Sequence, residues 1–223
     1  MTTRERLFDR IHMLTSQTLQ EEIASGIIHG IGILISIAAL VLLVVFASLQ
    51  HNVNQVVSFA IFGGFAVFYY LCSTFHHSLM HYKAKRIFRI MEQSAVYLFI
   101  TGTIFPLNLV ILQSSLGWSI FIVTAVLCLI GILNLFFNKR NSADIGFIIN
   151  LLLILFLIVT LIICLKFFSA SFKIFFIPGA ILYLVSFWFA SMNGMKYNQA
   201  YAHAITLAAT ILHFFAFFQL INL

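Results

Sequence analysis

Long apolar stretches separated by short polar segments dominate the chain from residue 24 onward. Each stretch is close to the ~20 residues that an α-helix needs to cross a bilayer. The segments between them are short, as in a compact helical bundle. We therefore predict an all-α polytopic membrane protein, a bundle of seven transmembrane helices with approximate spans 24–48, 56–79, 91–112, 117–137, 145–165, 174–192 and 199–221.

The start of the chain differs from the rest because it is polar and charged. Leucine and isoleucine recur there at helical spacing among three arginines, Arg4, Arg6 and Arg10. This pattern predicts a short amphipathic helix on the cytoplasmic surface. We therefore divide the chain into an N-terminal segment, 1–22, and a seven-helix transmembrane domain, 23–223. No cleavable signal peptide is expected, because the first long apolar run begins only after about twenty polar and charged residues.

Composition agrees with a membrane protein, since 62% of the residues are hydrophobic and 8% are charged. A soluble domain would need far more polar surface. Cys72, Cys128 and Cys164 lie inside apolar runs, and their spacing indicates neither a disulfide framework nor a zinc finger. The net charge of +6 comes from basic residues scattered over short loops. Membrane topology explains that distribution better than nucleic-acid binding does, so no nucleic-acid partner is expected.

Basic residues gather on one side of the predicted bundle. Ten of the twelve precede the first span or lie between spans two and three, four and five, or six and seven, whereas Lys166 and Lys173 fall on the other side. Loops rich in lysine and arginine stay in the cytoplasm. We therefore predict a cytoplasmic N-terminus and a C-terminus on the far side of the membrane.

Small and polar residues form a stripe along three of the predicted helices. Residues three and four apart lie on one helix face, and small or polar faces favour helix–helix contact over lipid contact. The stripes are Glu22, Ser25, His29, Gly32 and Ser36 on span one, Gly63, Ala66, Tyr70, Ser73 and His77 on span two, and His203, Thr206, Thr210 and His213 on span seven. Each of these helices thus carries a histidine on its predicted inward face.

Three ionisable groups share one predicted depth near the cytoplasmic side. His77 closes span two, Glu92 opens span three, and His203 lies about one turn into span seven. Ionisable groups at membrane depth are costly and mark functional sites. One interpretation is a zinc site, in which the imidazoles bind the ion, Glu92 holds or deprotonates a water molecule, and Ser73 orients that water or a substrate carbonyl. The other is that these groups only hydrogen-bond the helices together.

Other polar residues are expected outside the ligand set. His29 lies two turns after Glu22, so that this carboxylate can hold its imidazole behind the ligands, with a purely structural role as the alternative. His213 follows His203 by ten residues, which is about 15 Å along a helix and too far to share one ion. We expect His213 to pack or to hydrogen-bond.

Four stretches together resemble the hemolysin III family, the bacterial branch of the progestin and adipoQ receptor superfamily. They occur in the family's order and span nearly the whole chain: EEIASGIIHGIG (21–32), STFHHSL (73–79), MEQSAVYLFITGTIFP (91–106) and HAITLAATILHFFAFF (203–218). The resemblance implies a multi-pass protein of the bacterial cell membrane, with seven helices and a cytoplasmic N-terminus. That topology agrees with the distribution of basic residues.

The resemblance also implies an intramembrane zinc held by three histidines, with an acidic residue beside a water molecule. Ser73 and His77 match the motif on span two, and His203 matches the second histidine of a pair on span seven. Gln199 falls at the first histidine of that pair, and Glu92 replaces an aspartate. The implied ligands are therefore His77, His203 and Gln199. An amide oxygen is a weaker zinc ligand than an imidazole, so zinc affinity should fall.

Two further positions depart from the family pattern. His76 stands where a tyrosine is usual, and Ser25 where an asparagine is usual. His76 is an alternative third ligand. Adjacent residues on a helix point about 100° apart, however, which disfavours His76 and His77 binding one ion.

Two kinds of function fit these observations. The first is zinc-dependent hydrolysis of a lipid amide or ester, similar to that of the alkaline ceramidases, with a membrane lipid or lipid-derived molecule as substrate. The second is a non-catalytic membrane protein that affects lipid homeostasis or causes cytolysis and keeps only a vestigial metal site. A monomeric aqueous pore is disfavoured because the helices offer no polar lumen. A transporter is a third hypothesis, but the sequence shows no inverted repeat and no paired broken helices to support it.

Overall fold

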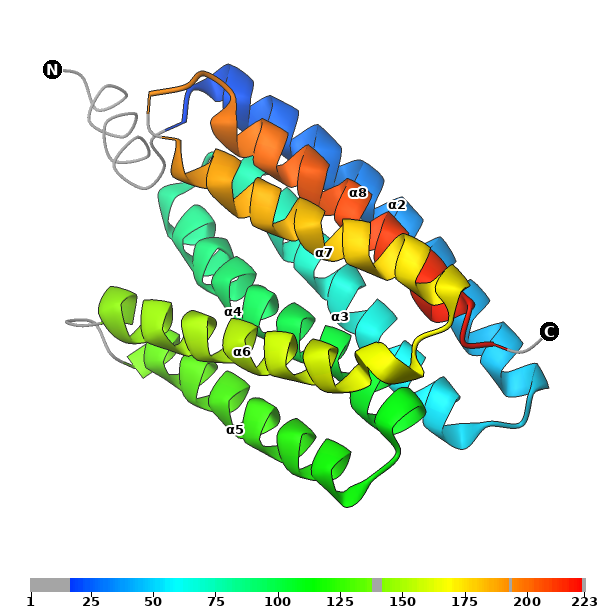
Figure 1. Ribbon diagram of the computed structural model, residues 1–223. Coiled ribbons are helices and arrows are strands. Elements are labelled where there is room, and N and C mark those ends of the chain that lie inside the picture. Colours follow the sequence, from blue (N-terminus) through cyan, green and yellow to red (C-terminus); the bar gives the residue numbers. More distant parts are fainter. Residues whose placement is uncertain (1–16, 138–141, 193, 222–223) are drawn as a thin grey trace, which may run out of the picture.

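The computed structural model describes residues 17–137, 142–192 and 194–221. Within these ranges the chain forms seven helices long and apolar enough to span a membrane, and no strand (Figure 1). The predicted all-α, seven-helix fold is therefore confirmed. The helices are α2 (Leu19–Leu49), α3 (Val53–Ser78), α4 (Tyr82–Pro106), α5 (Ser115–Phe137), α6 (Ser142–Cys164), α7 (Ala170–Ser191) and α8 (Asn198–Phe218), with a π-helix η1 (Leu107–Leu112) after α4 and a 3-10 helix η2 (Leu165–Phe167) after α6.

The first helix begins earlier than its predicted span. Residues 19–22, expected in the N-terminal segment, belong to α2. A capping box fixes this start: the Thr18 hydroxyl accepts from the Glu21 N–H at 3.4 Å, and the Glu21 carboxylate accepts from the Thr18 N–H at 2.7 Å. The other oxygen of Glu21 accepts from the backbone N–H of Tyr197 at 2.6 Å, which ties the start of α2 to the start of α8. The predicted amphipathic helix lies in residues 1–16, outside the described residues.

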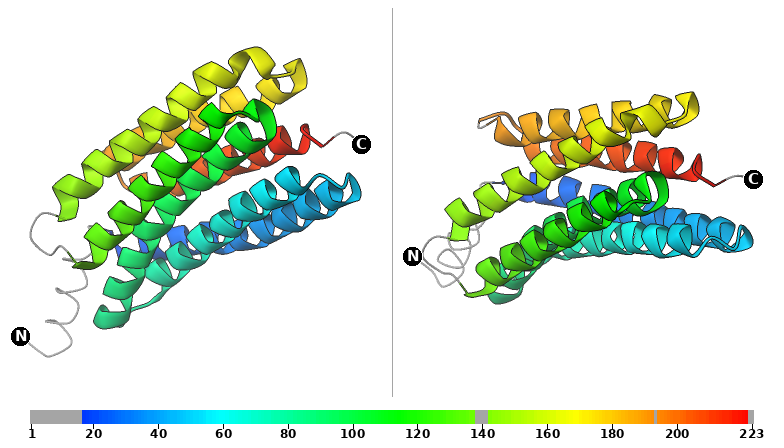
Figure 2. Two further views of the ribbon diagram at one scale, coloured as in Figure 1. Left: turned by 90° about the horizontal axis from the view of Figure 1, so that it is seen from below. Right: turned by 60° about the horizontal axis from the view of Figure 1, so that its bottom comes forward.

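Helix α2 packs between α3 and α8, so the first and last described helices are neighbours (Figures 1 and 2). On one side of this trio, α4 packs against α3, and α5 and α6 pack against α4 and against each other. On the other side, α7 packs against α8. All seven helices run roughly along one common direction in Figure 2. This order brings residues separated by most of the chain length to one place.

Glycines allow the closest of these helix contacts. A Cβ atom on Gly63 of α3 would lie 2.8 Å from the Cβ of Leu40 on α2. A Cβ atom on Gly179 of α7 would lie 2.5 Å from Cδ2 of His213 on α8. Small residues at such points let membrane helices approach closely and gain packing contacts.

The bundle buries polar side chains together with an apolar core and exposes further apolar side chains on its outer surface. On α2, Ser25 and His29 are completely buried, whereas Leu34 is 71% exposed. All five residues of the stripe predicted on span one are buried, as are all five on span two. Such an arrangement suits an apolar surrounding, in which a polar group needs partners within the protein. The cytoplasmic position of the N-terminus stays a prediction from the basic loops.

Candidate metal centre

Three histidines from three helices meet at one point of the bundle. His29 of α2 has its ring centroid 5.5 Å from that of His77 on α3 and 4.3 Å from that of His203 on α8. The rings of His77 and His203 lie 5.1 Å apart. One ligand nitrogen of each residue lies within 4.8 Å of the other two. This meeting follows from the fold, because α2 packs against both α3 and α8.

The ring nitrogens of these histidines are buried without hydrogen-bond partners among the described residues. This holds for both nitrogens of His29 and for Nε2 of His77 and of His203. Buried polar atoms are nearly always paired, so the convergence of several unpaired nitrogens at one point is consistent with a bound ligand there. Neutral imidazole is a good ligand for zinc, and three imidazoles form a complete protein ligand set for a catalytic zinc. The donor set therefore fits the metal that the sequence suggested.

An acidic residue and a fourth histidine adjoin this point. Oε1 of Glu92, on α4, lies 3.8 Å from Nε2 of His77, and Oε2 of Glu92 lies 3.9 Å from Nδ1 of His76. His76, His77 and Glu92 form a second group whose ligand atoms lie within 4.8 Å of one another. The side chain of Glu92 is 16% exposed, while those of both histidines are buried. Glu92 thus connects the histidine cluster with the surface of the bundle.

A buried network supports His77 from behind. Oε2 of Glu22 lies 2.9 Å from Nδ1 of His77 and accepts a hydrogen bond from Nζ of Lys85 at 2.9 Å. The same ammonium donates to the carbonyl of His76 at 2.8 Å. Because a carboxylate oxygen accepts, Nδ1 of His77 donates in this contact, and Nε2 is the ring nitrogen left for the cluster. Glu22 was expected behind His29, and the structure places it behind His77.

Two other residues proposed from the sequence, Ser73 and Gln199, lie nearby. Ser73 is completely buried one turn before His77. Gln199 lies in the first turn of α8, one turn before His203, and its side-chain amide donates to the carbonyl of Ala190 on α7 at 3.0 Å. In the described structure, the third histidine beside His77 and His203 is His29.

His213 lies apart from these groups. Its ring stacks on Phe176 with a centroid distance of 4.3 Å and an interplanar angle of 5°, and Tyr183 packs against it at 5.1 Å. Both partners belong to α7. This agrees with the expectation that His213 packs between helices.

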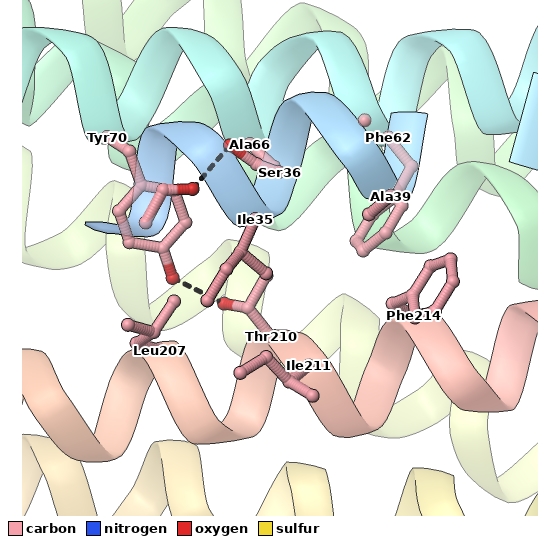
Figure 3. Close-up of a pocket in the computed structure, with 12 residues that line it drawn as sticks. Ile35, Ser36, Ala39, Phe62, Ala66, Tyr70, Leu207, Thr210, Ile211 and Phe214 are labelled. Carbon is pink, nitrogen blue, oxygen red and sulfur yellow. Dashed lines mark hydrogen bonds between the residues drawn. The ribbon is translucent and has the colours of Figure 1, made fainter. Parts of the chain in front are cut away.

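An apolar pocket adjoins the histidine cluster, between α2, α3 and α8 (Figure 3). Gly32 lies three residues beyond His29, and Leu207 lies four residues beyond His203, so the pocket continues from the cluster along both helices. Its walls are Gly32, Ile35, Ser36, Ala39, Phe62, Gly63, Ala66, Tyr70, Leu207, Thr210, Ile211 and Phe214. Most of these side chains are aliphatic or aromatic, and the free volume that they enclose is about 10 Å³.

Tyr70 stands between the pocket and the cluster. Its ring centroid is 5.7 Å from that of His29, and its hydroxyl forms a 2.8 Å hydrogen bond with the hydroxyl of Thr210. Figure 3 shows this side chain reaching from α3 toward α8. Tyr183 of α7 bonds to the same threonine oxygen at 3.0 Å. These contacts connect Tyr70 of α3 with α2, α8 and, through Thr210, α7, at the end of the pocket that faces the histidines.

Comparison with known proteins agrees with this architecture. The family model described as "Haemolysin-III related" matches residues 17–214. The chain is 36% identical to the Hemolysin-3 homolog of Bacillus subtilis (strain 168) over 199 residues, which cover 89% of this chain and 93% of that protein. It is 34% identical to Hemolysin-3 of Bacillus cereus over 203 residues, covering 90% and 91%. The chain belongs to the haemolysin-III-related family. Together with the apolar helices, this makes it a multi-pass membrane protein.

Two residues of this haemolysin-III-related protein have positions that sequence patterns do not reveal. The stripe on span one indicates that His29 faces inward, but periodicity does not tell which helices that face will meet. Lys85 belongs to a cluster of basic residues before span three, where topology alone accounts for a cation. Its burial depends on the turn between α3 and α4, which folds the first turn of α4 toward Glu22.

Proposed function

We propose that this haemolysin-III-related protein is a zinc-dependent hydrolase that cleaves an amide or ester bond of a membrane lipid. The observation that carries the proposal is the convergence of His29, His77 and His203, with their unpaired nitrogens, beside Glu92. Catalytic zinc sites commonly combine three protein ligands with one open position. A carboxylate next to that position is the usual general base in metal-assisted hydrolysis.

The chain's own residues divide the chemistry among them. A ring nitrogen of His29 and the Nε2 atoms of His77 and His203 would hold the ion. When bound, zinc supplies a Lewis acid that polarises a carbonyl group and makes water more acidic. Glu92 takes the proton of the attacking water and returns it to the leaving amine or alcohol as the C–N or C–O bond breaks. The products are a carboxylic acid and an amine or alcohol, and Ser73 would orient the carbonyl.

The surroundings favour a lipid over a water-soluble substrate. The cluster lies within a bundle whose outer surface is apolar, and the adjoining pocket has mostly hydrocarbon walls. The free volume of the pocket is about 10 Å³, so an acyl chain would lie along α2 and α8, with its carbonyl end toward Tyr70 and the histidines, only after these helices moved apart. Apolar pockets with a few convergent polar groups are typical binding sites for such ligands.

Metal content tests the proposal directly. Protein purified in detergent should contain one zinc per chain by elemental analysis, and competition with a chelator should give its affinity. His29→Ala, His77→Ala and His203→Ala should each lower the affinity by roughly 10–100-fold. His213→Ala is the matched control, because it removes a buried histidine that stacks on Phe176 outside the cluster. Absence of zinc from the wild type, or equal loss in the control, would contradict the metal site.

A second measurement separates metal binding from hydrolysis. Glu92→Gln keeps the size of the side chain but removes the base, so it should retain zinc while hydrolysis falls by roughly 10²–10⁴-fold. The assay is release of fatty acid from N-acyl and O-acyl lipids in mixed micelles. Unchanged hydrolysis in this variant would remove Glu92 from the mechanism.

The names of the relatives favour a second candidate, a cytolytic or lipid-modulating protein without catalysis. Both curated relatives carry the name hemolysin. Under this alternative, wild type and Glu92→Gln should release haemoglobin from red cells, or dye from lipid vesicles, to the same extent. If lysis instead depends on Glu92, lysis follows from hydrolysis of membrane lipid.

A further inference from the structure

Lys85 is an unusual residue because its long cationic side chain is almost entirely buried. It is 1% exposed, although it lies in the first turn of α4, next to the surface turn that joins α3 and α4. Lys83, two residues earlier, is exposed as a lysine there would be expected to be. Lysine is almost never fully buried without a partner, because removing its charge from water is costly.

The buried ammonium joins three helices. Lys85 of α4 donates to Oε2 of Glu22 on α2 at 2.9 Å and to the carbonyl of His76 on α3 at 2.8 Å. The same oxygen of Glu22 lies 2.9 Å from Nδ1 of His77. One oxygen of Glu22 therefore contacts both the ammonium of Lys85 and the ring of His77, a candidate metal ligand. Glu22 is itself only 6% exposed.

We propose that Lys85 is a positioning residue for His77. Its ammonium holds the Glu22 carboxylate in one orientation, and the carboxylate in turn keeps the proton of His77 on Nδ1. Nε2 then has the free lone pair and points toward the cluster, where Glu92 lies 3.8 Å away. Histidine ligands are commonly fixed in this way by a carboxylate on the second nitrogen. This inference deepens the proposed function, because it concerns a ligand of the same metal.

The second hydrogen bond of Lys85 strengthens the argument. A lysine that only neutralised Glu22 would not need the carbonyl of His76, which belongs to the last turn of α3. This bond fixes the helix end that carries both His76 and His77. Lys85 thereby fixes the backbone of the ligand as well as its ring, since an ammonium has three donors to distribute. The hydrogen bonds of Lys85 thus connect the turn between α3 and α4 with the candidate metal centre.

The test uses histidine labelled with ¹⁵N in the full-length, metal-free protein in detergent. The His77 signal, assigned by its loss in His77→Ala, should show a single Nδ1–H tautomer in the wild type. Lys85→Met, which keeps length but removes charge and donors, should give a tautomer mixture and lower zinc affinity by roughly 10–100-fold. Lys85→Arg restores charge and donors and should recover most of both. Lys83→Met is the matched control on the same helix and should behave as wild type.

The outcomes separate the positioning role from the proposed function. If wild type binds no zinc but Lys85→Met alters the His77 tautomer, the positioning role stands and the metal function falls. If zinc binds and Lys85→Met changes neither tautomer nor affinity in folded protein, the positioning role is wrong and the metal function stands. Should Lys85→Met fail to accumulate, Lys85→Gln should change the tautomer and the zinc affinity in the same direction but less, because it removes the charge and keeps a donor.

Discussion

At the residue scale, the third imidazole of the centre comes from α2 and not from the start of α8. The ring of His29 adjoins the rings of both His77 and His203, while the amide of Gln199 donates to the carbonyl of Ala190 near the end of α7. Both observations concern the direction of a side chain. That direction determines whether a residue can bind the ion, and its position in the sequence does not. Gln199 lies one helical turn from His203, and side chains so spaced share a helix face.

A residue exchange between these two positions is therefore informative. His29→Ala should lower zinc affinity by roughly 10–100-fold, and adding Gln199→His to that variant should restore part of it. Gln199→His alone should change the affinity by less than about 10-fold, because His29 already supplies the third nitrogen. Chelator competition in detergent measures these three variants and Gln199→Ala. Full affinity in His29→Ala together with a loss in Gln199→Ala would make residue 199 the third ligand.

At the element scale, the interface of α2 with α3 determines the shape of the centre. Gly32 leaves room for the ring of Tyr70, since a Cβ atom there would overlap Cδ1 of that ring. The ring separates the pocket from His29 and bonds to Thr210. The close approach of two helices and the closure of the pocket thus depend on the same glycine.

Substitutions on α2 test this dependence. Gly32→Ala should destabilise the bundle by about 1–3 kcal/mol, because the tyrosine must move in a packed interior. Gly30→Ala, on the same helix, has no atom within 4 Å of the added methyl group. It should be neutral or stabilising by up to about 1 kcal/mol, since alanine favours the helix. Denaturation by heat or SDS measures both, and equal effects would contradict the role of Gly32.

Much of the architecture was predictable from the sequence because membrane spans and inward faces depend on local composition. The stripe through Ser25 and His29 is buried as expected, and the seven spans differ from the helices mainly at their ends. Which helices become neighbours depends on packing across the whole bundle, which local patterns do not encode. For this reason α2 was not expected between α3 and α8, nor Lys85 beside Glu22.

At the scale of the whole molecule, the centre lies toward one end of the bundle. It forms where α3 ends and where α4 and α8 begin, and the basic loops predict that this end faces the cytoplasm. Substrate and products would then exchange with the cytoplasmic side of the bilayer.

Reporter fusions test this orientation. A reporter that is active only in the cytoplasm should give a signal when fused to the N-terminus. A reporter that is active only outside the cytoplasm should give a signal when fused to the C-terminus. The reason is that an odd number of spans places the two ends on opposite sides, and ten of twelve basic residues lie on the N-terminal side. A cytoplasmic signal from both fusions would contradict the predicted topology.

The contact between α2 and α8 also has a consequence for biosynthesis, because the three histidines can meet only after α8 has been made. The ribosome synthesises α2 and α3, which carry His29 and His77, first, and α8, which carries His203, last among the described helices. Until then the newly made chain holds two histidines of an unfinished set within the bilayer. A metal bound as proposed would have its full ligand set only once insertion is complete, so metal loading would report that all the described helices have been inserted.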